Sequence, residues 1–124
     1  MSTALQPHGD SDLDALVPAW LTLPDVAERV VTTVPRVRQM LSEHALVAVR
    51  RDGVLYVPAL LVDGDHPVKG LQGLLTVLTD GGYDEVEAVR WLFTADDSLP
   101  GTPAQALAEN RGGEVKRRAQ ALAL

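Results

Sequence analysis

The chain lacks cysteine entirely and has few aromatic residues, with two Trp, two Tyr and one Phe among its 124 residues. The absence of cysteine excludes disulfide bonds and thiolate metal sites, and it is compatible with a reducing compartment. Because aromatic residues make up only 4% of the composition, a core has to be built mainly from Val, Leu and Ala. No apolar run approaches the roughly 20 residues that span a bilayer. The acidic, polar start of the chain does not have the pattern of a secretory signal.

Positive charge is also scarce, and it is unevenly distributed. The net charge is −6, and residues 1–28 hold five acidic residues and no Lys or Arg. Residues 29–51 hold five Arg and one Glu, whereas residues 52–110 hold ten acidic residues, one Lys and one Arg. Residues 111–124 are basic again. Because salt screens charges beyond roughly 8–10 Å, local charge decides whether a surface attracts phosphate. The basic segment 29–51 therefore predicts a polyanionic partner, and the acidic remainder predicts modest affinity.

Length and periodicity predict a mainly α protein. A chain of 124 residues is long enough for one domain, or for two small ones that share a core. We expect an acidic tail at residues 1–14, a winged helix–turn–helix at 15–60 and a small C-terminal helical bundle at 61–124. The tail is expected to be disordered, because Ser, Asp, Gly and Pro are frequent there and apolar periodicity is weak.

Two short helices are predicted within this winged segment. Thr22 and Thr33 are expected helix N-caps, since each is followed by an aliphatic residue and then by proline. The helices are expected at residues 23–30 and 34–44. Their expected buried faces consist of Val26, Ala27 and Val30 in the first and Val37, Met40 and Leu41 in the second. The turn of three residues between them is typical of a helix–turn–helix.

A β-hairpin is predicted directly after these helices. The β-prone segments 47–51 and 54–57 flank Asp52-Gly53. Asp-Gly is among the strongest hairpin signals, because a type I′ turn needs positive φ at both central positions. This turn places Arg50 and Arg51 at the hairpin tip, where they are positioned to touch a DNA backbone or minor groove.

The second helix and the hairpin tip together form the predicted DNA-binding site. Arginine can bind phosphate or guanine, and glutamine can pair with adenine. The expected contacts are Thr33, Pro35, Arg36, Arg38, Gln39, Arg50 and Arg51. The alternative is that these arginines form an ordinary solvated helix face and protect an edge strand. A secondary DNA contact is predicted at Lys116, Arg117 and Arg118, although the same cluster suits a helix whose C-terminal end favours cations.

The second half of the chain is predicted to be helical. Helices are expected at residues 70–80, 83–93, 103–110 and 114–122, with a break at Gly81-Gly82. The expected buried residues are Leu71, Leu74, Leu75 and Leu78 in the first helix and Val86, Val89 and Phe93 in the second. Trp20 and Trp91 are also expected in the core. The outer face of the second helix is acidic, so it is better suited to a protein partner than to DNA.

Patterns of catalysis and metal binding are missing from the sequence. His8, His44 and His66 are far apart and lack a second ligand at helical spacing. The Asp-Gly-Asp-His run at residues 63–66 lacks the rest of an EF-hand and predicts a turn. The glycines at residues 70–73 do not form a phosphate-binding loop, because no Gly-Lys-Ser/Thr follows them. We therefore expect a protein that is not an enzyme and has no cofactor, metal or small-molecule substrate.

Several runs resemble known families. LTLPDVAERVVTTVPRVRQMLSEHALVAVRRDGVLYVP resembles the MerR/excisionase type of winged helix. HALVAVRRDGVLYVP, VKGLQGLLTVLTDGGYDEVEAVRWLF and EVKRRAQALAL resemble an actinobacterial family of small DNA-binding proteins, known in mycobacteria. Members of this family have a winged helix followed by a C-terminal helical domain of uncharacterised role. The resemblance covers about residues 20–124 and implies sequence-directed or nucleoid-type DNA binding. It implies a recognition helix at 34–44 and a wing at 47–57.

Two functions remain compatible with the sequence. The first is binding of double-stranded DNA in transcriptional regulation or nucleoid organisation, with a cytoplasmic (nucleoid) location. The second is a protein–protein module, adaptor or antitoxin-like, that binds its partner through the C-terminal helices. The run LPGTPAQALAENRGGEV resembles the toxin-binding region of some antitoxins and motivates this alternative. A membrane partner is not expected from either function.

Overall fold

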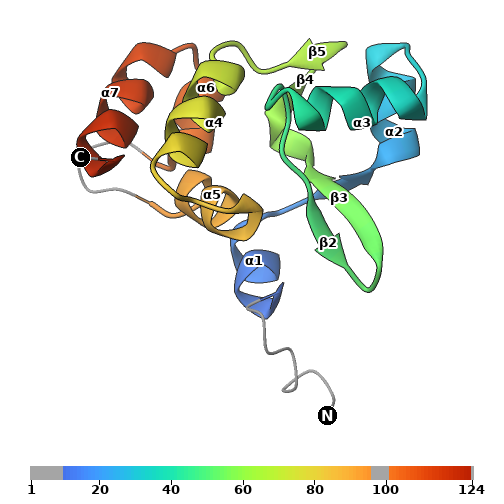
Figure 1. The fold of residues 1–124 in the computed structure, drawn as a ribbon, viewed down its shortest axis with the longest axis horizontal. Helices are drawn as coiled ribbons and strands as arrows, with labels where there is room; N and C mark the ends of the chain where they lie inside the picture. Colours follow the sequence, from blue (N-terminus) through green and yellow to red (C-terminus); the bar gives the residue numbers. More distant parts are fainter. Residues whose placement is uncertain (1–9, 96–100, 124) are drawn as a thin grey trace.

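The computed structural model describes residues 10–95 and 101–123 of the chain. Its N-terminal half consists of α1 (Asp10–Leu16), β1 (Trp20–Thr22), α2 (Leu23–Val30), α3 (Val34–Ser42), β2 (Val49–Arg51) and β3 (Val54–Pro58). A 3₁₀ turn (Ala59–Leu61), β4 (Val62–Asp63) and β5 (His66–Pro67) lead to α4 (Leu71–Asp80), α5 (Glu85–Leu92), α6 (Pro103–Ala108) and α7 (Gly112–Ala123). Figure 1 shows α2, α3 and the β2–β3 hairpin on one side and α4 to α7 on the other. The predicted mainly α fold is confirmed.

Local hydrogen bonds explain where α2 and α3 begin. The Asp25 N–H donates to Thr22 Oγ1 (3.2 Å), and the Thr22 N–H donates to the Asp25 carboxylate (3.1 Å). This capping box satisfies two backbone donors of the first turn of α2. At α3, the Arg36 N–H donates to Thr33 Oγ1 (3.3 Å). Both predicted N-caps are therefore confirmed.

The C-terminal end of α3 differs from the prediction. The helix ends at Ser42 rather than at residue 44. His44 takes a left-handed conformation (φ 61°), and the Ala45 N–H then donates to the Met40 carbonyl (2.9 Å). A left-handed residue stops the helix while still satisfying one of its last carbonyls. The sequence signal was weak because this position is histidine and not glycine.

The hairpin belongs to a three-stranded sheet with the order β1-β3-β2. Asp52 (φ 52°) and Gly53 (φ 80°) both have the positive φ that the predicted type I′ turn requires. The strand β2 begins at Val49, two residues later than expected. The strand β1 was not predicted, although Trp20 pairs with Pro58 across the sheet. Its three residues are too few to show an alternating pattern.

The N-terminal tail prediction is wrong for residues 10–14, which form most of α1. Leu13 (0% exposed) and Val17 (3% exposed) join the hydrophobic core. Two apolar residues four positions apart are enough to attach one turn of helix to a core, but too few to stand out in an acidic sequence. Residues 1–9, also predicted to be disordered, lie outside the described residues.

The C-terminal helices follow the predicted pattern closely. The four expected leucines of α4 are at most 3% exposed. In α5, Asp84 and Glu87 form a reciprocal capping box, Val89 and Phe93 are buried, and Val86 is half-buried. Helix α6 is two residues shorter at its end than expected, and α7 begins at Gly112 rather than at residue 114. Between α5 and α6, residues 96–100 lie outside the described residues.

Buried side chains from both halves form one core cluster. Val26 and Val57 contribute from the winged half, and Leu74 and Leu107 from the helical half, all at 2% exposure or less. Trp20 and Trp91 are half-buried and pack against this core. Because the halves share a core, the predicted division at residues 60 and 61 stays a prediction. The shared core also holds α3 and the hairpin in one orientation.

Candidate nucleic-acid interface

The outer face of α3 presents the polar residues predicted for DNA contact. Val37 and Met40 are buried, with 0% and 6% of their surfaces exposed. The remaining face is exposed and consists of Pro35, Arg36, Arg38, Gln39, Ser42 and Glu43. Thr33, at the N-cap, is exposed as well. The structure therefore brings five of the predicted site residues onto one open surface.

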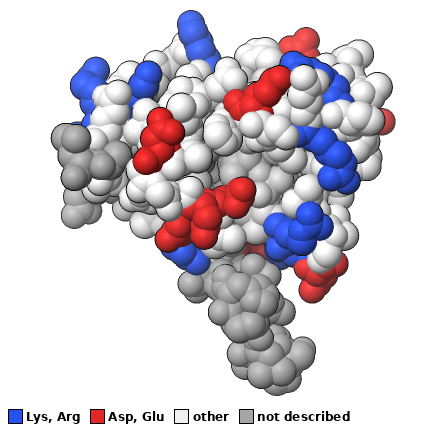
Figure 2. All heavy atoms as spheres, viewed as in Figure 1, with Lys and Arg blue, Asp and Glu red and all other residues white. Residues whose placement is uncertain are grey.

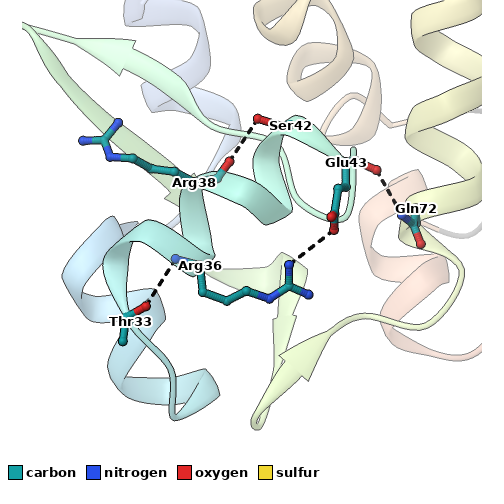
Figure 3. A network of polar contacts seen from close by, with 6 residues as sticks. All are labelled: Thr33, Arg36, Arg38, Ser42, Glu43 and Gln72. Atoms are coloured by element: carbon teal, nitrogen blue, oxygen red, sulfur yellow. Dashed lines mark hydrogen bonds and ion pairs between the residues drawn. The ribbon is translucent and has the colours of Figure 1, made fainter.

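Arg36 is paired with Glu43 along this helix. Its Nη1 lies 3.5 Å from Glu43 Oε1, and the two side chains are 47% and 44% exposed. Figure 3 shows the Arg36 side chain running along α3 toward Glu43, whose carbonyl oxygen accepts a hydrogen bond from Gln72 Nε2 (3.0 Å). Such an exposed ion pair contributes little to stability, so a phosphate can replace the carboxylate. The contact with Gln72 fixes the end of α3 against α4.

Arg38 is directed differently from Arg36. In Figure 3 its side chain projects away from Arg36, and its carbonyl oxygen accepts a hydrogen bond from Ser42 Oγ (3.3 Å). The side chain of Arg38 is exposed, as is that of the neighbouring Gln39. The two arginines of α3 therefore diverge, a geometry that suits contacts with separate sites on a duplex.

The two arginines predicted at the hairpin tip are placed on opposite faces of the sheet, because successive side chains of a strand alternate. Arg50 is exposed, and its Nη1 donates to the Gly53 carbonyl (3.1 Å). Arg51 instead forms an ion pair with Asp14 of α1, and its guanidinium lies 4.9 Å from the centre of the Trp20 ring. Its side chain is only 22% exposed. Both arginines lie next to the turn as expected, but only Arg50 is exposed, and contact of either with DNA stays a prediction.

The secondary cluster on α7 lies far from this surface. Lys116 and Arg117 are exposed, and Arg118 is half-buried. Figure 1 places α7 at the end of the molecule opposite to α3 and the hairpin. Lys116 and Lys69 line a hollow of about 480 Å³ bordered by the glycines of α4 and α7. The structure does not bring the α7 cluster together with the predicted recognition helix.

Figure 2 shows Lys and Arg side chains over α3 and the hairpin, and again over α7. Asp and Glu side chains lie over the region of α4 and α5 between them, and others lie among the basic side chains of the winged half. This surface would attract a polyanion at α3 and the hairpin and repel it at the middle helices.

A groove separates the hairpin from α5. It has a volume of about 580 Å³, and its apolar lining includes Leu41, Leu55, Tyr83 and Val86. Arg50 borders it on the hairpin side, and Asp84 and Glu85 border it on the α5 side. Across the described residues, no group of three His, Asp or Glu side chains is arranged to hold a metal ion. The described helices are likewise too short or too polar to cross a membrane.

Two residues near this surface were missed by sequence reasoning. Val31, in the turn between α2 and α3, is 82% exposed and has a left-handed backbone (φ 59°). The signal was its position just after the end of α2, where left-handed residues are common. Asp14 was missed because it was assigned to a disordered tail. No local pattern indicates that it pairs with a strand 37 residues away.

Comparisons with known proteins cover nearly the whole chain. The family model described as "DNA-binding protein Rv2175c, wHTH domain" matches residues 7–62, and that described as "Rv2175c C-terminal domain of unknown function" matches residues 68–123. "DNA-binding protein Rv2175c" of Mycobacterium tuberculosis (strain ATCC 25618 / H37Rv) is 44% identical over 130 aligned positions, which cover 94% of this chain and 88% of the relative.

A solved structure agrees with these matches. The NMR structure of Rv2175c superimposes with a TM-score of 0.78 at 42% identity, covering 86% of this chain and 82% of that one. The expected mycobacterial-type family is confirmed, whereas the MerR/excisionase likeness stays a prediction because the matches bear neither name. The chain belongs to the Rv2175c family, in which a winged helix–turn–helix domain is followed by a C-terminal domain of unknown function.

Proposed function

We propose that this protein binds double-stranded DNA through α3 and the β2–β3 hairpin, as a transcriptional regulator or a nucleoid-associated factor. The observation that carries the proposal is the exposed face of α3, which presents Arg36, Arg38 and Gln39 on a protein with a net charge of −6. The family match supports it, because the relative from M. tuberculosis is named a DNA-binding protein. We propose a binding protein rather than an enzyme on the same grounds.

The shape of the surface supports a division of labour between the helix and the hairpin. The major groove of B-DNA is about 12 Å wide and admits one α-helix. In the proposed complex the N-terminal part of α3, with Thr33 and Pro35, enters this groove. Arg36, Arg38 and Gln39 then reach phosphates or base edges. Arg50 contacts the backbone or the adjacent minor groove from the hairpin.

The salt dependence of binding tests this proposal. Each phosphate that is neutralised contributes about 0.9 to the slope of log K against log salt concentration. We expect the triple variant Arg36→Ala, Arg38→Ala, Arg50→Ala to bind a fluorescent genomic duplex more weakly and with a slope shallower by about 2–3. Arg117→Ala, which removes a positive charge from the far end of the molecule, is the matched control. Unchanged affinity and slope in the triple variant would rule out this surface as the DNA site.

The two proposed roles differ in how the protein distributes along a chromosome. A transcriptional regulator should occupy few discrete sites, because specific affinity exceeds non-specific affinity by several orders of magnitude. A nucleoid factor should cover DNA broadly. Sequencing of DNA cross-linked to the protein in cells, with the triple variant as background, distinguishes these outcomes and tests the nucleoid location.

The groove beside α5 favours a second function, binding of a protein partner through the C-terminal helices. Its lining includes apolar side chains such as Leu55 and Val86, and exposed Asp84 and Glu85 form one rim. We propose as occupant a partner segment with one apolar side chain flanked by Lys or Arg, because this chemistry complements both features.

A photoreactive amino acid at position 85 tests this second function in cells. We expect a cross-link to one basic, apolar segment, and we expect it to be lost in the Val86→Asp variant. Cross-links to acidic segments, or cross-links that Val86→Asp leaves unchanged, would contradict the proposed occupant.

A further inference from the structure

Helix α1 is tied to the hairpin by the side chain of Arg51. Arg51 Nη2 donates to the Asp14 carboxylate, a contact that joins α1 to β2. The guanidinium also lies over two aromatic rings, 4.9 Å from the centre of Trp20 and 5.5 Å from the centre of Tyr56. These two rings meet edge to face, with centroids 6.5 Å apart. Arg51 is therefore surrounded by groups from α1, β1 and β3.

Exposure differs between the two members of the ion pair. The Arg51 side chain is 22% exposed, whereas that of Asp14 is 49% exposed. Arg51 Nε is buried and has no hydrogen-bond partner. The Nε edge of the guanidinium is thus buried, whereas Nη2 contacts the half-exposed Asp14 carboxylate. A phosphate oxygen could take the place of the carboxylate at Nη2, because both are anionic acceptors for N–H donors.

We propose that Asp14 withholds Arg51 from DNA, so that α1 competes with phosphate for the second arginine of the hairpin and lowers the affinity for DNA. This inference rests on the proposed function. Asp14 would be a positioning residue, since it acts on DNA only through Arg51. The neighbouring Arg50 lies on the other face of the sheet and stays exposed, so the hairpin would offer DNA one arginine and hold the other back.

The packing of α1 makes this competition separable from folding. Leu13 in α1 and Val17 just after it are buried at 0% and 3% exposure, so apolar packing holds α1 to the core in addition to the ion pair. Asp14→Asn keeps the size of the side chain and removes only its charge. Because Leu13 and Val17 stay buried in this variant, we expect α1 to remain in place, and thermal unfolding checks this.

A double-mutant cycle of Asp14→Asn and Arg51→Ala tests the proposal. Binding of a fluorescent genomic duplex would be measured between 50 and 300 mM NaCl, together with thermal unfolding of each variant. We expect Asp14→Asn to bind several-fold more tightly, with a salt slope steeper by about 0.9, because Arg51 then neutralises one phosphate. Arg51→Ala alone should leave the slope unchanged, and in the double variant the gain should disappear. Asp80→Asn, the same charge change at the exposed end of α4, should not alter the slope.

Other results would overturn the proposal. A slope made shallower by about 0.9 in Arg51→Ala alone means that Arg51 already contacts phosphate. Weaker DNA binding by Asp14→Asn at unchanged stability means that Asp14 holds the hairpin in the conformation that binds DNA. Tighter binding without a steeper slope, or an equal effect of Asp80→Asn, means that only overall charge matters. Arg51→Gln, which removes the charge and keeps a long polar side chain, replaces Arg51→Ala if the latter does not fold. Failure of the proposed function would appear separately, as an unchanged slope in the Arg36, Arg38 and Arg50 triple variant.

Discussion

The winged half and the helical half are built by the same local rules, yet they present opposite charges. Thr33 begins α3 and Thr102 begins α6 with the same side-chain cap, and in each case proline follows in the first turn. Both halves bury aliphatic side chains in one core. They differ in what remains outside, which is arginine on α3 and carboxylate on α5. The two proposed functions therefore depend on exposed residues of elements whose folding follows common principles.

The first prediction tests whether one half of the molecule can unfold without the other. Leu74→Ala should lower the free energy of unfolding by about 2–5 kcal/mol, because it leaves a cavity in the shared core. The two tryptophans lie in different halves. Urea unfolding of Leu74→Ala, followed in Trp91→Phe and in Trp20→Phe backgrounds, should give the same midpoint from either half. Two separate midpoints would show that the halves have separate cores.

The second prediction compares basic residues from the two halves. Arg38→Ala should weaken DNA binding about tenfold, which corresponds to about 1.4 kcal/mol for a charge-assisted contact. Arg117→Ala, on α7, should leave the affinity unchanged because it is exposed at the other end of the molecule. Fluorescence anisotropy with one duplex at fixed salt measures both. Equal losses would mean that DNA wraps around to α7, so that the two basic regions form one site.

The third prediction removes the same cap from each half. Thr33→Ala and Thr102→Ala should each cost about 1 kcal/mol of stability, because each leaves a first-turn N–H of its helix without an acceptor. Thr33→Ala should also weaken DNA binding, since it frays the start of the proposed recognition helix. Thermal unfolding and anisotropy, measured on both variants, separate the effects. If Thr102→Ala weakened DNA binding equally, the reason would have to be general loss of folded protein.

The smallest effect concerns the ends of α2 and α6. Asn110, just after α6, has a left-handed backbone (φ 69°) that asparagine tolerates, whereas Val31, just after α2, has the same conformation (φ 59°). Val31→Gly should therefore raise the free energy of unfolding by about 0.5–1 kcal/mol, since glycine is not strained there. Asn110→Gly, the matched change, should have a smaller effect. A loss of stability in Val31→Gly would mean that the exposed valine makes a stabilising contact.

Much of the fold was predictable because its signals are local. Each predicted cap joins residues three positions apart, and the hairpin turn depends on two adjacent residues that adopt positive φ. The bounds of α2 and the buried leucines of α4 followed from such patterns. In contrast, β1 forms only because Trp20 and Thr22 pair with β3, which lies beyond both helices in the chain. A strand of three residues has no pattern of its own.

The features of the candidate site also divide into those that local sequence predicts and those that depend on the tertiary structure. The exposed face of α3 follows from helical periodicity alone, and so does the position of Arg38 and Gln39 on it. The sequence alone also determined where α2, α3 and α6 begin and where the hairpin turns, because the groups involved lie within four residues of one another. Only the tertiary structure decided that α1 packs against α5, where Asp14 meets Arg51 while Arg50 stays exposed. Contacts between distant segments depend on how the whole core packs, and no short stretch of sequence contains that information.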